Sequence, residues 1–294
     1  MKVYLKPDTS SRGINRVVDA LIQYKPPQVE VVESPTEADL EIIHVYGRNE
    51  SVERRIDSLI EKKKPFSMIQ YALRSTMKPH TAQWVRMWEK SVCVWSYYDL
   101  YKMLDDDLVM GEFNFYHAPL GVDTDIFDGQ SVVLPKNKRW VVFTTSQHAL
   151  AEGVRECAFA AKAVGRKMFF AGHELRRGPD IVCRANLTDQ EMAWNYGASE
   201  FVCGLRRVEG FELPVIEGAM CGARPIVFDQ PHYRQWFGEF AIFIAERDRD
   251  KVIEDLTKIF TLGTLPISDK ERGIMRDRFS WPKIINNYWR KLYE

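Results

Sequence analysis

The chain contains little cysteine and shows no cysteine pattern. Only 5 of its 294 residues are cysteines, and no two of them form a C-x-x-C pair. Most lie within apolar runs, so we expect reduced, buried thiols of the kind found in cytoplasmic proteins. The 6 histidines also lack the spacing of a zinc site, and we expect no bound metal.

The chain also lacks a charge excess and a long apolar stretch. Its 41 basic and 41 acidic residues cancel, so no overall field attracts nucleic acid or a membrane surface, although a local basic cleft would escape this test. No apolar run approaches the length of a transmembrane helix, and Met1–Leu5 leads into a polar Lys-Pro-Asp sequence rather than a signal peptide. We therefore expect a cytoplasmic protein without a membrane span, and nucleic acid is not the expected partner.

The pattern that is present is an alternation of short apolar strands with amphipathic helices, which is typical of a parallel α/β sheet. An apolar stripe from Ile14 to Ile22 predicts the first helix. Strands are expected at Val3–Leu5, Val29–Val32, Leu40–Val45, Phe66–Ile69, Val92–Trp95, Trp140–Thr144, Met168–Ala171, Ile181–Cys183, Phe201–Cys203, Ile226–Phe228 and Ala241–Ile244.

A polar stretch divides the chain. Residues 128–138 (DGQSVVLPKNK) predict a linker between a short N-terminal domain, residues 1–127, and a second domain, residues 139–280. Residues 281–294 predict a strongly amphipathic terminal helix. The length suffices for two domains of ordinary size. The expected fold class is therefore α/β, with two Rossmann-like parallel-sheet domains.

The segment 209–229, EGFELPVIEGAMCGARPIVFD, predicts a loop, a helix and a strand in succession. Pro214 suits the first turn of the helix, and Gly222 ends it. Because helical side chains tilt toward the N-terminus, Glu217 leans back toward the helix start, which Glu209 approaches from the loop. Free N–H groups there favour a phosphate, and a carboxylate on each side can accept hydrogen bonds from hydroxyls. This arrangement indicates a nucleotide sugar.

Three motifs carry a family resemblance. They are E-G-F-E-L-P-V-I-E at residues 209–217, P-L-G-V-D at residues 119–123 with Phe127, and T-D-Q-E at residues 188–191 with Tyr196. On these motifs the chain resembles the family-4 retaining glycosyltransferases of the GT-B type. The match is specific over residues 115–245 and loose over the first hundred residues.

The resemblance implies two Rossmann-like domains that face each other across a cleft, with the terminal helix packed back on the first domain. It implies transfer of a hexose from a UDP or GDP sugar, without a metal or another cofactor. By resemblance, Glu209 would bind hydroxyls of the donor hexose with the help of the amides of Gly210 and Phe211. The amide of Leu213 would meet the distal phosphate, and Glu217 would bind the ribose hydroxyls.

The chain departs from this family where the diphosphate would bind. Ser146 stands in place of an Arg, and Glu152 in place of a Lys. Glu212, within the donor-binding segment, replaces a Gly and adds a negative charge. In the first domain, Tyr71 falls near the position of a family His, and a tyrosine cannot serve as a base at neutral pH.

Other residues are candidates for the missing cations and for the remaining donor contacts. Arg206 lies just before Glu209 and is the candidate cation for the leaving diphosphate, hence a catalytic candidate. Arg184 ends a strand at the edge where the base should bind. Each of these arginines is also compatible with a plain surface charge. Gly13 belongs to a loop that either places amides under the donor phosphates or caps a helix.

Two further patterns have ordinary explanations. Trp84 and Trp88 stand four residues apart and could stack on a sugar, but an aromatic pair that packs into the core is the favoured interpretation. The D-x-D triplet at Asp123–Asp125, which holds a metal in another glycosyltransferase class, recurs elsewhere in the chain. We assign no metal to it.

The leading hypothesis is a retaining transfer of a hexose to a hydroxyl of a glycan, a lipid or a small molecule. No side chain is an obvious nucleophile, so we expect attack on the face from which the diphosphate departs. A nucleotide-sugar-binding protein with little or no transferase activity is the second hypothesis, because Ser146 and Glu152 would stabilise a departing diphosphate poorly. A glycosyltransferase that acts on modified DNA is a third, which the neutral net charge does not support.

Overall fold

The computed structural model describes residues 1–5, 12–46, 50–71, 81–103, 113–128, 139–145, 152–173, 179–207 and 211–293. The chain forms two compact units. The first contains Met1–Leu120, Phe211 and Trp281–Glu294, and the second contains Gly121–Val208 and Glu212–Ser280. Each unit is built on a six-stranded sheet, whose strand pairs are all parallel. The expected α/β class with two Rossmann-like sheets is confirmed. Most of the predicted linker, residues 129–138, lies outside the described residues.

The sheet of the first unit has the strand order β2-β1-β3-β4-β5-β6. Its strands are β1 (Lys2–Tyr4), β2 (Glu30–Val31), β3 (Leu40–Val45), β4 (Phe66–Gln70), β5 (Val94–Ser96) and β6 (Phe115–His117). Its described helices are α1 (Arg12–Gln23), α2 (Glu50–Glu61), α4 (Thr81–Lys90), α5 (Leu100–Met103) and α12 (Trp281–Tyr293). All these strands except β6 were predicted, with ends that differ by at most two residues.

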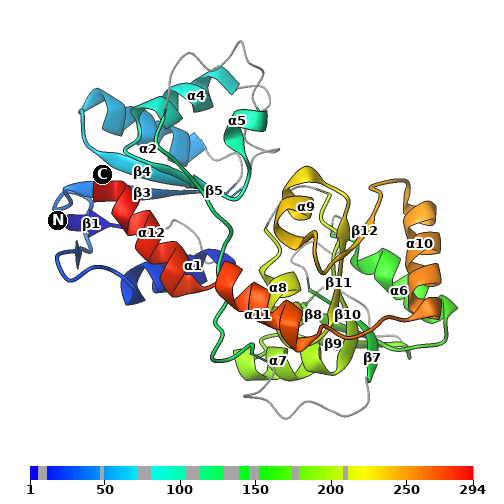
Figure 1. Cartoon of the computed structure of the whole chain (residues 1–294). Helices are drawn as coiled ribbons and strands as arrows, with labels where there is room; N and C mark the ends of the chain where they lie inside the picture. Colours follow the sequence, from blue (N-terminus) through cyan, green and yellow to red (C-terminus); the bar gives the residue numbers. More distant parts are fainter. Residues whose placement is uncertain are drawn as a thin grey trace. The chain divides into compact units, whose positions relative to one another are not determined.

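The C-terminal helix α12 belongs to the first unit and lies beside α1 (Figure 1). Its apolar face is buried, as its amphipathic sequence predicts. Two hydrogen bonds tie it to the sheet: the hydroxyls of Ser67 and Tyr288 lie 2.8 Å apart, and the Tyr116 hydroxyl donates to the Ile284 carbonyl at 2.8 Å. Chain segments from both ends of the sequence therefore share one core.

Aromatic side chains fill much of this core. Trp84 and Trp88 on α4 are 1% and 0% exposed, so the interpretation of this pair as core is confirmed.

The cysteines are reduced and mostly buried, as expected: all five thiols are free, and four are buried while Cys183 is half-buried. None of the described helices is both long and apolar enough to cross a bilayer.

A buried polar contact joins the carboxyl ends of three neighbouring strands in the first unit. His44 of β3 lies with Nδ1 2.9 Å from the Tyr71 hydroxyl and Nε2 3.1 Å from the Leu5 carbonyl. Because a carbonyl can only accept, Nε2 carries the proton, and Nδ1 accepts from Tyr71. Burial lowers the pKa of His44 from 6.5 to about 4, against a smaller opposing effect of the bond to Leu5. The imidazole is therefore neutral at physiological pH.

The second unit has the strand order β12-β11-β10-β7-β8-β9. Its strands are β7 (Trp140–Thr145), β8 (Met168–Ala171), β9 (Ile181–Arg184), β10 (Ser199–Gly204), β11 (Arg224–Phe228) and β12 (Ile242–Ile244). Its described helices are α6 (Val154–Ala163), α7 (Asp189–Gly197), α8 (Leu213–Met220), α9 (Pro231–Phe237), α10 (Arg249–Leu262) and α11 (Asp269–Arg278). Helices α6 and α10 pack side by side (Figure 1), and apolar residues of both meet the sheet in one core cluster.

Helix α8 lies unusually close to β10, and a glycine on each element permits this. A Cβ added to Gly218 of α8 would lie 2.8 Å from the Val202 side chain. A Cβ added to Gly204, the last residue of β10, would lie 2.5 Å from the Val215 side chain and 2.8 Å from that of Glu212. Neither position can hold a larger residue without a shift of the helix. The start of α8 is therefore held against the carboxyl end of β10.

The neutral buried state of His44 predicts acid sensitivity. The unfolded chain binds a proton below pH 6.5 and the folded chain only below about pH 4, so stability is present above 6.5 and is lost as the pH falls toward 4. This one group should remove about 3 kcal/mol of the free energy of unfolding. In His44→Gln the amide can donate to Leu5 and accept from Tyr71 without titrating. Denaturant unfolding of the variant at pH 7 and pH 4 should show a correspondingly smaller loss.

The exposed His173 supplies the control for this experiment. His173→Gln should leave the pH dependence of unfolding as it is in the parent chain. An equal pH dependence of the parent and His44→Gln would contradict the assignment of a neutral, buried His44.

Candidate functional site

The segment from which the sequence predicts a nucleotide-sugar site contains the start of α8, as predicted. Glu212 occupies the N-cap position, and Pro214 lies in the first turn. Phe211 is buried. Glu209 and Gly210 lie outside the described residues, so their assignment to the donor hexose stays a prediction.

The N-terminus of α8 offers an amide to a ligand. The Glu212 carbonyl accepts hydrogen bonds from the amides of Val215 and Ile216, at 2.9 and 3.3 Å, and Pro214 has no N–H. Among the described residues, the Leu213 amide has no acceptor. It can therefore donate to an anion at this helix end, the role that the resemblance gives it at the distal phosphate.

Glu217 is buried on α8 with 2% exposure, and a tyrosine from α7 orients its carboxylate. The Tyr196 hydroxyl donates to Glu217 Oε2 at 3.0 Å, while its ring packs against Phe143 with centroids 4.3 Å apart. The sequence analysis matched Tyr196 to the family pattern but did not foresee this bond. The role of Glu217 in binding ribose stays a prediction, now with a named partner for one carboxylate oxygen.

Arg206 lies between the two acidic residues that depart from the family pattern. Its Nε is 2.7 Å from Glu212 Oε1, and its Nη1 is 3.4 Å from Glu152 Oε1. The Arg206 side chain is about one third exposed (31%), whereas the Glu212 side chain is 4% exposed. We call these three residues the Arg206 cluster. The structure thus brings together the predicted cation and both unexpected carboxylates.

The Arg206 cluster has an unusual charge balance. With both carboxylates ionised it carries one more negative than positive charge. Burial raises the pKa of Glu212, the Arg206 guanidinium opposes that rise, and Glu152 adds to it. The next residue, Arg207, makes a separate pair with the buried Glu156 at 3.2 Å. Because both arginines are engaged with carboxylates, neither is a plain surface charge.

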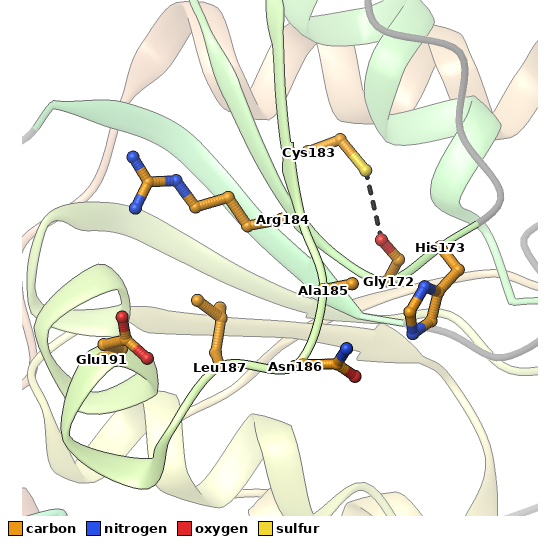
Figure 2. A pocket seen from close by; sticks show the side chains of 8 residues that line it. All are labelled: Gly172, His173, Cys183, Arg184, Ala185, Asn186, Leu187 and Glu191. Atoms are coloured by element: carbon orange, nitrogen blue, oxygen red, sulfur yellow. Dashed lines mark hydrogen bonds between the residues drawn. The ribbon is translucent and has the colours of Figure 1, made fainter.

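A pocket of about 500 Å³ lies at the carboxyl ends of β8 and β9 (Figure 2). The residues that line it are Gly172, His173, Cys183, Arg184, Ala185, Asn186, Leu187 and Glu191. Arg184 ends β9, as predicted, and lines this pocket. Ligands of open parallel sheets bind outside the carboxyl ends of the strands, so the location suits the base of a nucleotide.

The walls of this pocket are fixed by local hydrogen bonds. The Cys183 thiol donates to the Gly172 carbonyl at 3.2 Å (Figure 2). A capping box opens α7: the Thr188 amide and hydroxyl both donate to Glu191 Oε2, at 2.8 and 3.0 Å. Asn186 has a left-handed backbone with φ of 55°, a conformation that asparagine tolerates well.

The remaining candidates lie elsewhere. Ser146 lies outside the described residues. Gly13 lies in the first turn of α1, in the first unit. Within the described residues, no group of three or more His, Cys, Asp or Glu side chains could hold a metal ion.

Comparison with known proteins rests on structure alone. No protein-family model and no curated protein matches the sequence. The sucrose-phosphate synthase tll1590 from Thermosynechococcus elongatus is 11% identical, with a TM-score of 0.70 over 99% of this chain and 98% of that one. Alr3699/HepE from Anabaena, solved with UDP, is 11% identical, with a TM-score of 0.69 over 99% of each chain.

A third similar structure belongs to a larger protein. The pneumococcal O-GlcNAc transferase GtfA, solved with UDP and GlcNAc, is 13% identical, with a TM-score of 0.62. The match covers 86% of this chain but only 56% of GtfA, so the chain spans little more than half of that protein's length. Together with the two parallel sheets, these similarities show that the chain has the GT-B fold of glycosyltransferases.

The Arg206 cluster predicts a strong dependence of stability on one ion pair. Arg206→Met leaves the buried Glu212 carboxylate without its cation and should lower the free energy of unfolding by about 2–3 kcal/mol. Adding Glu212→Gln should restore most of that loss, because the buried charge is gone. Denaturant unfolding of the two single variants and the double variant measures the coupling.

The exposed pair of Arg234 and Asp229 provides a matched control. Arg234→Met should cost less than about 1 kcal/mol. Additive effects of Arg206→Met and Glu212→Gln would show that the pair is not coupled.

Proposed function

We propose that this protein is a retaining, metal-independent glycosyltransferase. It transfers a hexose from a nucleoside diphosphate sugar to a hydroxyl of a glycan, a lipid or a small molecule. The observation that carries the proposal is the second unit, where a GT-B sheet places the pocket at β8 and β9, the Leu213 amide and the buried Glu217 in one domain. HepE and GtfA, which share the fold, were solved with UDP.

The proposed donor would bind with its base in the pocket and its ribose hydroxyls at Glu217. The distal phosphate would accept a hydrogen bond from the Leu213 amide, where the positive end of the α8 dipole also favours an anion. Glu209 would bind hydroxyls of the hexose. The pocket and α8 belong to one unit, so the proposed contacts of the base, the ribose and the distal phosphate do not depend on the placement of the other unit.

The proposed reaction exchanges one bond for another at the anomeric carbon. The acceptor oxygen forms a bond to that carbon on the face from which the diphosphate oxygen departs. The acceptor proton passes to an oxygen of the departing diphosphate. Stabilisation of the leaving group then supplies most of the acceleration. Arg206 is the proposed cation for this role, with the Leu213 amide as a second donor.

The Arg206 cluster also favours a second candidate, a protein that binds a nucleotide sugar with little or no turnover. Two carboxylates already engage Arg206, which leaves it less able to stabilise a departing diphosphate. Time-resolved donor turnover with and without acceptors separates the candidates. Sugar attached to an acceptor, with the anomeric configuration of the donor retained, supports the enzyme. Tight donor binding with no turnover supports the binding protein.

The proposal predicts that substitution of Glu217 weakens nucleotide binding, whereas substitution of Glu209 impairs sugar recognition and turnover. Glu217→Gln should raise the dissociation constant of the free nucleotide roughly tenfold, because a charge-assisted hydrogen bond to ribose is weakened. Tyr196→Phe keeps the ring and removes only the bond that orients Glu217, so a smaller increase is expected. Glu209→Ala should impair sugar recognition and turnover while nucleotide affinity stays nearly unchanged. Calorimetric titration with nucleotide and with nucleotide sugar measures these effects.

The exposed Glu254 on α10 gives a control, and Glu254→Gln should change neither affinity. Full donor affinity and turnover in both Glu217→Gln and Glu209→Ala would overturn the assignment of the site.

A further inference from the structure

We propose that the pocket at β8 and β9 selects guanine, so that the donor is a GDP sugar rather than a UDP sugar. This inference rests on the proposed function, because it concerns the base of the same nucleotide. It is carried by two charged side chains of opposite sign that line one side of the pocket, Arg184 and Glu191. In Figure 2 both lie in the left part of the view, while His173 lies at the right.

The Arg184 guanidinium is available to a ligand. No described residue forms a hydrogen bond or an ion pair with it, and the side chain is exposed at the end of β9. A guanidinium presents five N–H donors in a rigid fork and cannot accept. It therefore requires acceptors on the base, and the O6 and N7 atoms of guanine form the acceptor pair that arginine most often binds.

The Glu191 carboxylate supplies an acceptor in the same pocket. Its Oε2 takes both capping bonds from Thr188, and Oε1 has no hydrogen-bond donor among the described residues. The bonds from the Thr188 backbone and hydroxyl, with the nearby Arg184, hold the pKa of Glu191 below its usual value. The carboxylate is therefore ionised at neutral pH and can only accept.

A guanidinium and a carboxylate that line the same pocket can discriminate among the four bases. Guanine and uracil place a carbonyl beside a ring N–H, which can meet Arg184 and Glu191 in that order. Adenine has no carbonyl, and the carbonyl of cytosine adjoins a ring nitrogen that accepts. Beyond its ring N–H, guanine has an amino group that donates again to the carboxylate. Uracil has a second carbonyl there, whose oxygen the carboxylate repels.

The test is calorimetric titration of the full chain with GDP, UDP, ADP and CDP. We expect GDP to bind at least about tenfold more tightly than UDP, the effect of one charge-assisted hydrogen bond. Glu191→Gln keeps an acceptor for the capping bonds but replaces the charge that meets guanine. It should weaken GDP roughly tenfold and change UDP little. Arg184→Met should weaken both nucleotides, and Lys251→Met, on the exposed part of α10, should weaken neither.

The outcomes separate this inference from the proposed function. Equal or tighter binding of UDP in the parent chain would overturn the guanine assignment and leave a nucleotide-binding protein. An unchanged ratio of GDP to UDP affinity in Glu191→Gln would overturn the role of the carboxylate. Failure of all four nucleotides to bind would overturn the proposed function as well.

Discussion

The close approach of α8 to β10 is the constraint on which the candidate site depends. Gly204 and Gly218 remove the side chains that would otherwise separate the helix from the strand. Because α8 cannot move outward without opening a cavity in a tightly packed core, its first turn is held at the carboxyl end of β10. The Leu213 amide and the Glu217 carboxylate therefore have fixed positions before any ligand binds. Such preorganisation lowers the entropy that binding must overcome.

A second consequence of this packing is the Arg206 cluster. Gly204 has no side chain, and the aliphatic part of Glu212 fills the adjacent space, which buries the carboxylate. A buried carboxylate is stable only with a partner, and Arg206 supplies it at 2.7 Å. Glu152 forms a second ion pair with the same guanidinium, at Nη1 of Arg206. Glu152 and Glu212, the two acidic residues that depart from the family pattern, are thus both explained by their pairing with Arg206.

The sequence predicted the sheets well because buried parallel strands are apolar along their whole length. The sequence did not predict β6, because its three residues, Phe115–His117, are all half-buried and do not form an apolar run. For the site, the pattern around Pro214 and Gly222 located α8 correctly. It could not predict the Tyr196–Glu217 bond or the pairing of Arg206 with Glu212, because each depends on how two segments pack.

The pocket also depends partly on features that the sequence shows and partly on how the chain folds. The sequence predicts a strand that ends in Arg184, and it contains the T-D-Q-E motif at residues 188–191. Their proximity follows only from the turn between β9 and α7, in which Asn186 adopts a left-handed conformation. Arg184, at the end of a strand, and Glu191, at the start of a helix, therefore line the same pocket.

The charge balance of the Arg206 cluster bears on how the proposed donor's diphosphate could be accommodated without the lysine of the glycosyltransferase family that the sequence resembles. A diphosphate at the start of α8 would add negative charge next to Glu212, whose pKa burial already raises. Negative charge nearby raises the pKa of a carboxyl further, so binding of the diphosphate and protonation of Glu212 favour each other. A protonated Glu212 would leave Arg206 shared only between Glu152 and the phosphate. The substitution of Gly by Glu212 therefore need not repel the donor, because uptake of one proton removes the excess negative charge of the cluster.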